Sequence, residues 1–243
     1  MCLIVVALGQ SARYPFIVAA NRDEQHSRPT QTAAWWSDPP NVLGGRDLRA
    51  GGSWLAVDRR GRMAAVTNVR DPPPEPAARS RGALVAEYLG GSDAALVYAA
   101  RAARDGARFG AFNLLVFDGG ELHYASNRAA TTALGPGVHA FSNAPRDVEW
   151  PKIASARTGV AHVLERELPL EPLFELLAQR QDTALPEQRY RSAHFVLGPV
   201  YGTRCSTVVL RDDAGNVTFA ERSFDADGRR VGEVRETFSI ERP

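Results

Sequence analysis

The first hydrophobic positions of the chain form two short runs that are separated by a polar turn. Residues 2–8 and 15–20 are rich in apolar and β-branched side chains, and residues 9–13 between them contain glycine, serine and polar side chains. Two such runs on either side of turn-forming residues are typical of a β-hairpin. We therefore expect an antiparallel pair of strands at the start of the chain.

The register of this hairpin places a cysteine beside a polar segment. With the turn centred near residues 11–12, residue 2 lies opposite roughly residue 21, where facing Cβ atoms are about 4.5–5.5 Å apart. Cys2 is thus expected beside Asn21, Arg22 and Asp23. A shift of one residue in the register would change which of the three faces the sulfur.

The remaining pattern alternates groups of strands with pairs of helices. Further strands are expected at residues 53–57, 63–67, 111–117, 121–126, 138–142, 205–211, 216–222 and 231–239. Helices are expected at residues 81–89, 93–104, 151–167 and 172–180, with Ser80 and Ser92 as N-caps of the first two. The glycine pairs at 44–45 and 51–52 mark turns or close backbone approach, and the proline-rich residues 71–76 form a loop.

This order of elements predicts an α+β fold. Hairpin-linked strands favour antiparallel sheets, and two helical pairs suggest that both outer faces are covered, which gives a four-layer α/β/β/α sandwich of two antiparallel sheets. A doubly wound parallel sheet would need strands and helices to alternate singly. We expect residues 1–243 to form a single domain.

Composition excludes several classes of function. The 243 residues are 44% hydrophobic, and 29 basic residues nearly balance 28 acidic ones, so no strong field exists to bind nucleic acid. The apolar runs are shorter than the roughly 20 residues of a membrane-spanning helix, and the N-terminus lacks the features of a secretory signal. We expect a cytoplasmic protein with reduced cysteines, and leave its oligomeric state open.

Other residue types add little chemistry. The 5 histidines are scattered and no cysteine pair has zinc-ligand spacing, so no metal site and no obligatory cofactor are expected. No phosphate-binding glycine motif is present. The lone lysine, Lys152, is attributed to codon usage and given no function. Cys205 is expected to be a buried strand residue. Trp35, Trp36 and Trp54 suit core packing better than an apolar ligand cleft.

Cys2 has the clearest chemical potential. Removal of Met1 would leave a cysteine with a free α-amino group of pKa about 7.7–8.0 beside a thiol of pKa about 8.5. Such a residue carries a nucleophile together with its own base. The alternative is a small core residue that happens to open a strand.

The residues around position 22 strengthen the catalytic interpretation. Arg22 can lower the pKa of a neighbouring thiol and bind a carboxylate, and Asp23 can orient an amine by accepting its hydrogen bond. The alternative is that residues 21–24 are simply a solvated polar loop after the strand.

Several motifs together resemble a known family. They are Asn21-Arg22-Asp23-Glu24 with Arg28-Pro29, Gly44-Gly45-Arg46-Asp47, Gly52-Ser53-Trp54-Leu55, Thr67-Asn68-Val69-Arg70, Phe141-Ser142-Asn143-Ala144 with Trp150-Pro151-Lys152, and Tyr201-Gly202-Thr203-Arg204. The set resembles the NRDE family, whose eukaryotic members are of the transport and Golgi organisation type. The resemblance spans essentially the whole chain and implies an N-terminal-nucleophile hydrolase-like fold. Family members are linked to lipid, acyl-coenzyme A and haem handling.

A more distant resemblance suggests roles for individual residues. Cys2, Arg22, Asn68 and Asn143 are similar to positions in choloylglycine hydrolases and penicillin V acylases. Asn68 would then donate to a developing oxyanion, and Asn143 would bind the α-amino group or position the substrate carbonyl. Gln25 stands where those enzymes have an aspartate, so Asp23 is the substitute. Arg204 is the candidate for their later arginine.

Two hypotheses follow from these residues. The first is a cysteine N-terminal-nucleophile hydrolase acting on an amide or thioester with an apolar acyl group, with Cys2, Arg22, Asp23, Asn68, Asn143 and Arg204 as its site. The second is a non-catalytic protein that binds and traffics haem, acyl-coenzyme A or another lipid. The expected partner in either case is a small molecule, and haem is a cofactor only under the second hypothesis.

Overall fold

The structure is a computed structural model that describes residues 2–70, 77–166, 169–180 and 186–241. The chain forms two compact units that alternate along the sequence. One unit comprises residues 1–28, 136–142 and 148–238, and the other comprises residues 29–135, 143–147 and 239–243. The single domain over residues 1–243 stays a prediction. The loop expected at residues 71–76 lies outside the described residues.

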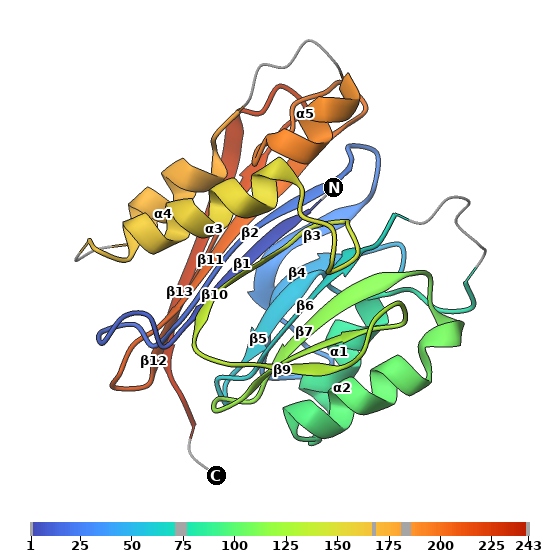
Figure 1. Ribbon diagram of the computed structural model, residues 1–243, viewed down its shortest axis with the longest axis vertical. Helices are drawn as coiled ribbons and strands as arrows, with labels where there is room; N and C mark the ends of the chain where they lie inside the picture. Colours follow the sequence, from blue (N-terminus) through green and yellow to red (C-terminus); the bar gives the residue numbers. More distant parts are fainter. Residues whose placement is uncertain (1, 71–76, 167–168, 181–185, 242–243) are drawn as a thin grey trace. The chain divides into compact units, whose positions relative to one another are not determined.

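The first unit is built on a six-stranded sheet with the strand order β10-β1-β2-β11-β12-β13. Its strands are β1 (Leu3–Leu8), β2 (Phe16–Gln25), β10 (Gly137–Phe141), β11 (Tyr201–Arg211), β12 (Asn216–Phe224) and β13 (Arg230–Ser239). Its helices are α3 (Pro151–Val163), α4 (Leu170–Leu177) and α5 (Pro186–Ser192). Helices α3 and α4 lie side by side over one face of this sheet (Figure 1).

Alternation along the strands places the apolar core of this unit beneath α3 and α4. Leu3, Val5 and Ala7 of β1 belong to the same buried cluster as Val160 of α3 and Leu173 of α4. Alternate strand residues point to one face, so a period of two delivers one apolar side to the helices. Burying a Val or Leu side chain contributes about 1.5–3 kcal/mol, and this core anchors the strands that carry the polar residues described below.

The N-terminal hairpin is confirmed with a small difference in register. Leu3 pairs with Asn21, and the antiparallel pairing continues to Leu8 opposite Phe16. The expected register placed residue 2 opposite residue 21, so it was wrong by one position. Strand β2 also extends to Gln25, beyond the expected end at residue 20, because β11 pairs with it along its whole length.

The second unit is built on a seven-stranded sheet with the strand order β3-β4-β5-β6-β7-β8-β9. Its strands are β3 (Thr30–Trp35), β4 (Val42–Asp47), β5 (Leu55–Asp58), β6 (Met63–Asn68), β7 (Phe112–Phe117), β8 (Leu122–Ser126) and β9 (Thr132–Leu134). Its helices are α1 (Gly82–Gly90), α2 (Ala95–Arg104) and the short 3-10 helix η1 (Gly106–Arg108). The expected α+β class with two antiparallel sheets is confirmed.

Strands β3, β4 and β9 and helix α5 were not expected from the sequence. Strand β4 contains the glycine pair that was attributed to turns or close approach. Close approach is correct, since a Cβ atom at Gly45 would lie 2.2 Å from the Trp54 ring and one at Gly44 would lie 2.7 Å from the Leu55 carbonyl oxygen. Glycine inside a strand therefore serves packing against the neighbouring strand here.

Neither serine that was expected as an N-cap occupies the N-cap position, which is Arg81 in α1 and Ala94 in α2. Ser80 lies one residue before the N-cap of α1, and its hydroxyl accepts a hydrogen bond from the Gly82 amide at 3.3 Å. Ser92 is not the cap of α2. The Asp118 carboxylate from the β7–β8 turn accepts from the Ala95 amide at 3.1 Å instead, so a residue distant in sequence takes the capping role.

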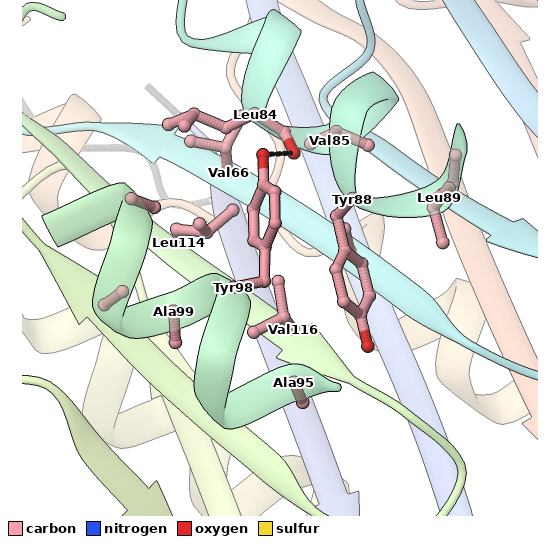
Figure 2. Packing of buried hydrophobic residues seen from close by; sticks show 14 of the residues in the cluster. Val66, Leu84, Val85, Tyr88, Leu89, Ala95, Tyr98, Ala99, Leu114 and Val116 are labelled. Atoms are coloured by element: carbon pink, nitrogen blue, oxygen red, sulfur yellow. Dashed lines mark hydrogen bonds between the residues drawn. The ribbon is translucent and has the colours of Figure 1, made fainter. Parts of the chain in front are cut away.

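Two tyrosines join α1 and α2 in the core of the second unit. The Tyr98 hydroxyl donates to the Leu84 carbonyl at 2.7 Å, and its ring lies 5.1 Å from the Tyr88 ring between centroids (Figure 2). Both side chains are fully buried among Val85, Val116 and other apolar residues. A buried hydroxyl group needs a hydrogen-bond partner, so the Tyr98 hydroxyl ties α2 to the backbone of α1 at Leu84.

We predict that Tyr98→Phe destabilises the protein by about 1 kcal/mol, because the Leu84 carbonyl loses its donor while the ring packing is kept. Urea denaturation measures the effect as a lower midpoint. Val97→Ala on the exposed side of the same helix is the control and should stay within about 0.5 kcal/mol of the wild type. Equal midpoints for Tyr98→Phe and the wild type would contradict this role of the hydroxyl.

Candidate active site

Cys2 lies where the hairpin argument placed it. It precedes β1, and its Sγ atom is 3.9 Å from the backbone oxygen of Asp23. The Cys2 carbonyl accepts a hydrogen bond from the Ser142 hydroxyl at 2.7 Å. The expectation that the thiol lies beside residues 21–23 is confirmed. The pairing of the adjoining Leu3 with Asn21 and the hydrogen bond from Ser142 constrain the backbone of Cys2.

The polar segment beside the thiol is a buried part of β2. Asn21, Arg22 and Asp23 are 1%, 5% and 4% exposed. The alternative of a solvated loop is therefore wrong. Charged residues are seldom buried to this degree without partners, so the segment is costly to place here unless its neighbours stabilise it.

Neighbouring residues hold Asp23 in one orientation. The Thr203 hydroxyl donates to Asp23 Oδ1 at 2.6 Å, and the same hydroxyl accepts from the Val196 amide at 2.9 Å. The Tyr201 hydroxyl donates to the Asp23 backbone oxygen at 2.9 Å. These contacts from β11 and the segment before it give the carboxylate a fixed direction, which a residue that orients an amine needs.

Arg22 lies across from the second cysteine. Cys205 of β11 is its direct partner in the antiparallel pairing and is 4% exposed. Burial raises the pKa of the Cys205 thiol well above its usual range, and Glu221 raises it further. Cys205 is a buried strand residue, as expected, and remains a neutral thiol.

The environment of the Cys2 thiol favours the protonated form. Although the residue as a whole is half-buried, burial of the thiol raises its pKa, and the Asp23 charge adds to this rise. The charges of the amino terminus and of Arg22 lower the pKa of the same thiol. Arg22 acts in the expected direction, but burial outweighs it. The resting thiol therefore needs a base before it can attack.

Arg204 binds the turn that follows β2. Its guanidinium donates to the carbonyl oxygens of Gln25, His26 and Arg28 at 2.9, 3.2 and 3.2 Å. Burial lowers the pKa of Arg204, and the nearby charge of Arg22 lowers it further. The side chain thus shapes the end of the segment that carries Arg22 and Asp23.

The two asparagines of the expected site contact each other in the second unit. Asn143 Nδ2 donates to the backbone oxygen of Asn68 at 2.7 Å, and the Asn143 backbone oxygen accepts from the Arg70 amide at 3.0 Å. Asn143 is 3% exposed, and within the described part of the chain its Oδ1 atom has no hydrogen-bond partner. Asn68 is the exposed last residue of β6.

Lys152 and His194 are buried polar residues that the sequence analysis did not select. Lys152 is 0% exposed. Burial lowers its pKa, while the charges of Asp23 and Cys2 raise it. The ring of His194 contacts the Leu176 carbonyl oxygen at 2.9 Å and the Ser155 hydroxyl at 2.8 Å. The sequence signal for Lys152 is that it is the only lysine of the chain, and codon usage alone is enough to explain such a count.

Three further features of the described residues bear on ligand binding: possible metal ligands, a surface pocket and the tryptophans. Among the residues that the structure describes, no group of three His, Cys, Asp or Glu side chains is arranged to hold a metal ion. A surface pocket of about 400 Å³ in the second unit is lined by Pro39, Asp58, Arg59, Leu89 and Glu241, among others. None of the expected site residues lines it. Trp36 is buried in the core, whereas Trp35 and Trp54 are half-buried.

The helices that the structure describes are all too short or too polar to cross a membrane.

Two solved structures with a similar fold have names that describe hydrolysis. A cysteine-to-alanine variant of conjugated bile acid hydrolase from Clostridium perfringens has a TM-score of 0.55 and 10% identity, and the match covers 99% of this chain and 97% of that one. An N-acylethanolamine-hydrolyzing acid amidase ortholog from Caenorhabditis elegans has a TM-score of 0.50 and 11% identity, with 86% and 92% covered. At such identities the likeness shows the fold alone. It confirms the expected N-terminal-nucleophile hydrolase-like fold.

Sequence relatives identify the family. The Transport and Golgi organization protein 2 homolog of Bos taurus is 35% identical over 240 residues, which cover 87% of each chain. The Mus musculus homolog is 33% identical over 247 residues, with 89% of this chain and 90% of that one covered. The family described as Transport and Golgi organisation 2 matches residues 1–226. These findings confirm the resemblance seen in the motifs, and the chain belongs to the Transport and Golgi organisation 2 family.

Proposed function

We propose that this protein is a cysteine N-terminal-nucleophile hydrolase that cleaves an amide or a thioester with an apolar acyl group. The observation that carries the proposal is the position of Cys2 Sγ, 3.9 Å from the Asp23 backbone, at a buried polar segment that includes Arg22. A fold shared with hydrolases supports the reaction class, but the reaction itself has to be argued from the residues of the site.

The first chemical step needs a base. Once Met1 is removed, the free α-amino group of Cys2 accepts the Sγ proton, and the thiolate attacks the acyl carbon to form a C–S bond. The tetrahedral intermediate collapses as the bond to the leaving nitrogen or sulfur breaks, and the ammonium returns its proton to that atom. Water then hydrolyses the acyl thioester and regenerates the thiol.

Arg22 and Asp23 prepare the nucleophile in this proposal. The positive charge of Arg22 opposes the effect of burial and favours the thiolate. Asp23, fixed by Thr203 and Tyr201, orients the α-amino group by accepting its hydrogen bond. Arg204 positions the chain after β2 through the three carbonyl groups that it binds.

The asparagines have complementary roles in the proposal. The exposed side-chain amide of Asn68 donates to the developing oxyanion, a contribution of about 3–4 kcal/mol for a well-placed donor. Asn143 uses its amide nitrogen on the Asn68 backbone, which leaves the Oδ1 acceptor. An acceptor favours an N–H group, so binding an amine suits Asn143 better than binding a carbonyl oxygen.

The names of the structural neighbours agree with the proposed substrate class. One is a conjugated bile acid hydrolase and the other hydrolyses N-acylethanolamines. We propose the same general class here and a cytoplasmic location, with no nucleic acid partner.

The alternative is a non-catalytic protein that binds and traffics haem, acyl-coenzyme A or another lipid. The raised pKa of the Cys2 thiol favours it, because a protonated thiol is a poor nucleophile. The pocket beside Pro39 does not support an apolar ligand, since Asp58, Arg59 and Glu241 contribute charged side chains to it.

Cys2→Ala should reduce turnover of acyl thioesters and N-acyl amides by at least about 10³-fold, because the attacking atom is lost. Steady-state assays over a panel of acyl chain lengths measure this. Cys205→Ala removes the other thiol and should keep activity within about threefold. Absence of turnover in the wild type, together with equal haem or acyl-coenzyme A binding by the wild type and Cys2→Ala, would support the alternative.

The native protein should lack Met1, since the proposed base is the α-amino group of Cys2. Intact mass spectrometry of material from its own host is expected to give a mass lower than that of the full sequence by one methionine. A retained Met1 in protein that turns over substrate would overturn the role of this amine.

A further inference from the structure

Lys152 occupies a position that local physical chemistry disfavours. It is the second residue of α3, after Pro151, and is fully buried. The N-terminal turn of a helix carries a partial positive charge, which opposes a cation there. A fully buried lysine also loses hydration, so it is rare unless an anion or hydrogen bonds stabilise it. A nearby anion or hydrogen-bond acceptor must therefore offset the free-energy cost of burying a lysine at this position.

A chain of contacts connects Lys152 to the segment beside the cysteine. The Ser155 hydroxyl donates to the Lys152 backbone oxygen at 3.3 Å and contacts the His194 ring at 2.8 Å. The His194 backbone oxygen accepts from Asn21 Nδ2 at 2.8 Å. Asn21 and Asp23 are two residues apart in β2 and so lie on the same face of the strand.

The charges that act on these groups come from several elements. Asp23 of β2 and Cys2 act on Lys152, and Lys152 in turn lowers the pKa of His194, after burial as the larger cause. Arg22 and the amino terminus act on Cys2, as does Asp23. A Coulomb interaction is mutual, so a cation that responds to the Cys2 thiolate also stabilises it.

We propose that Lys152 is a positioning residue of the cysteine site, whose ammonium group holds the Asp23 carboxylate and stabilises the Cys2 thiolate. The inference deepens the proposed function and rests on it for its catalytic meaning. In this proposal Lys152 acts as an ammonium ion, which the Asp23 and Cys2 charges favour against the opposing effect of burial, and the Sγ proton goes to the amine of Cys2. The lysine thus supplies a buried positive charge that does not depend on the processing of Met1.

The Cys2 arm of the proposal is tested by the pH dependence of alkylation with iodoacetamide in a Cys205→Ala background. Lys152→Met removes the charge and keeps the length of the side chain. We expect its alkylation rate at pH 7.5 to fall about tenfold and the midpoint to move to higher pH, since loss of a nearby cation raises the thiol pKa. Arg157→Met removes an exposed cation from the same helix and should change the rate by less than about twofold.

The Asp23 arm is tested without altering Lys152. Because the chain has a single lysine, protein labelled with ¹³C at the lysine Cε gives one lysine resonance, and its titration reports Lys152 alone. The Asp23→Asn variant should titrate lower than the wild type by about one pH unit, because the carboxylate no longer favours the ammonium form.

Unchanged alkylation in folded Lys152→Met, or a lysine resonance that titrates identically in the wild type and Asp23→Asn, would overturn the proposal. Neither measurement needs turnover. A hydrolase that loses activity in Cys2→Ala but shows no effect of Lys152 would reject this inference alone. The expected charge effects in a protein without turnover would retain the role of Lys152 toward Cys2 and reject the hydrolase.

Discussion

The pairing of β1 with β2 is the interaction on which the proposed site depends. It runs from Leu3 opposite Asn21 to Leu8 opposite Phe16, and the outer neighbours β10 and β11 hold the same two strands in place. Side chains alternate between the two faces of a strand. A slip of one residue would therefore move each of the Arg22 and Asp23 side chains to the face opposite the one that it now occupies. The apolar residues beneath α3 and α4 oppose such a slip, because it would move Leu3 and Val5 out of the core. Ordinary core packing therefore fixes the position of the thiol.

The polar end of this hairpin concentrates groups that are unfavourable to bury. Asp23 is stabilised by Thr203, and its charge and that of Lys152 act on each other inside the first unit. Burial raises the pKa of the Cys2 thiol, and the charges of the amino terminus and of Arg22 lower it. Opposed influences on one thiol are common at functional sites, where the protonation state must change during the reaction. A packing role alone would be served better by apolar residues of similar volume.

The parts of this fold that local sequence determines were predictable. The N-terminal hairpin, the position of Cys2 beside residues 21–23 and the helical pairs followed from apolar periodicity and turn residues. Strand β4 was missed because Gly44 and Gly45 indicate turns unless the neighbouring Trp54 and Leu55 are known. The capping of α2 by Asp118 and the effect of the Asp23 charge on Lys152 both depend on residues distant in sequence. Burial of residues 21–23 likewise requires β11, which lies about 180 residues further along the chain.

The central claim is that Cys2 Sγ forms a covalent bond with the acyl group of a substrate. Acid quenching of the protein during turnover of a long-chain acyl thioester, followed by peptide mass spectrometry, tests it most directly. The account predicts a mass increase equal to one acyl group on the peptide that begins with Cys2, and none in the Cys2→Ala variant. Turnover in a Cys2→Ala variant, or an acyl adduct confined to another residue, would contradict it.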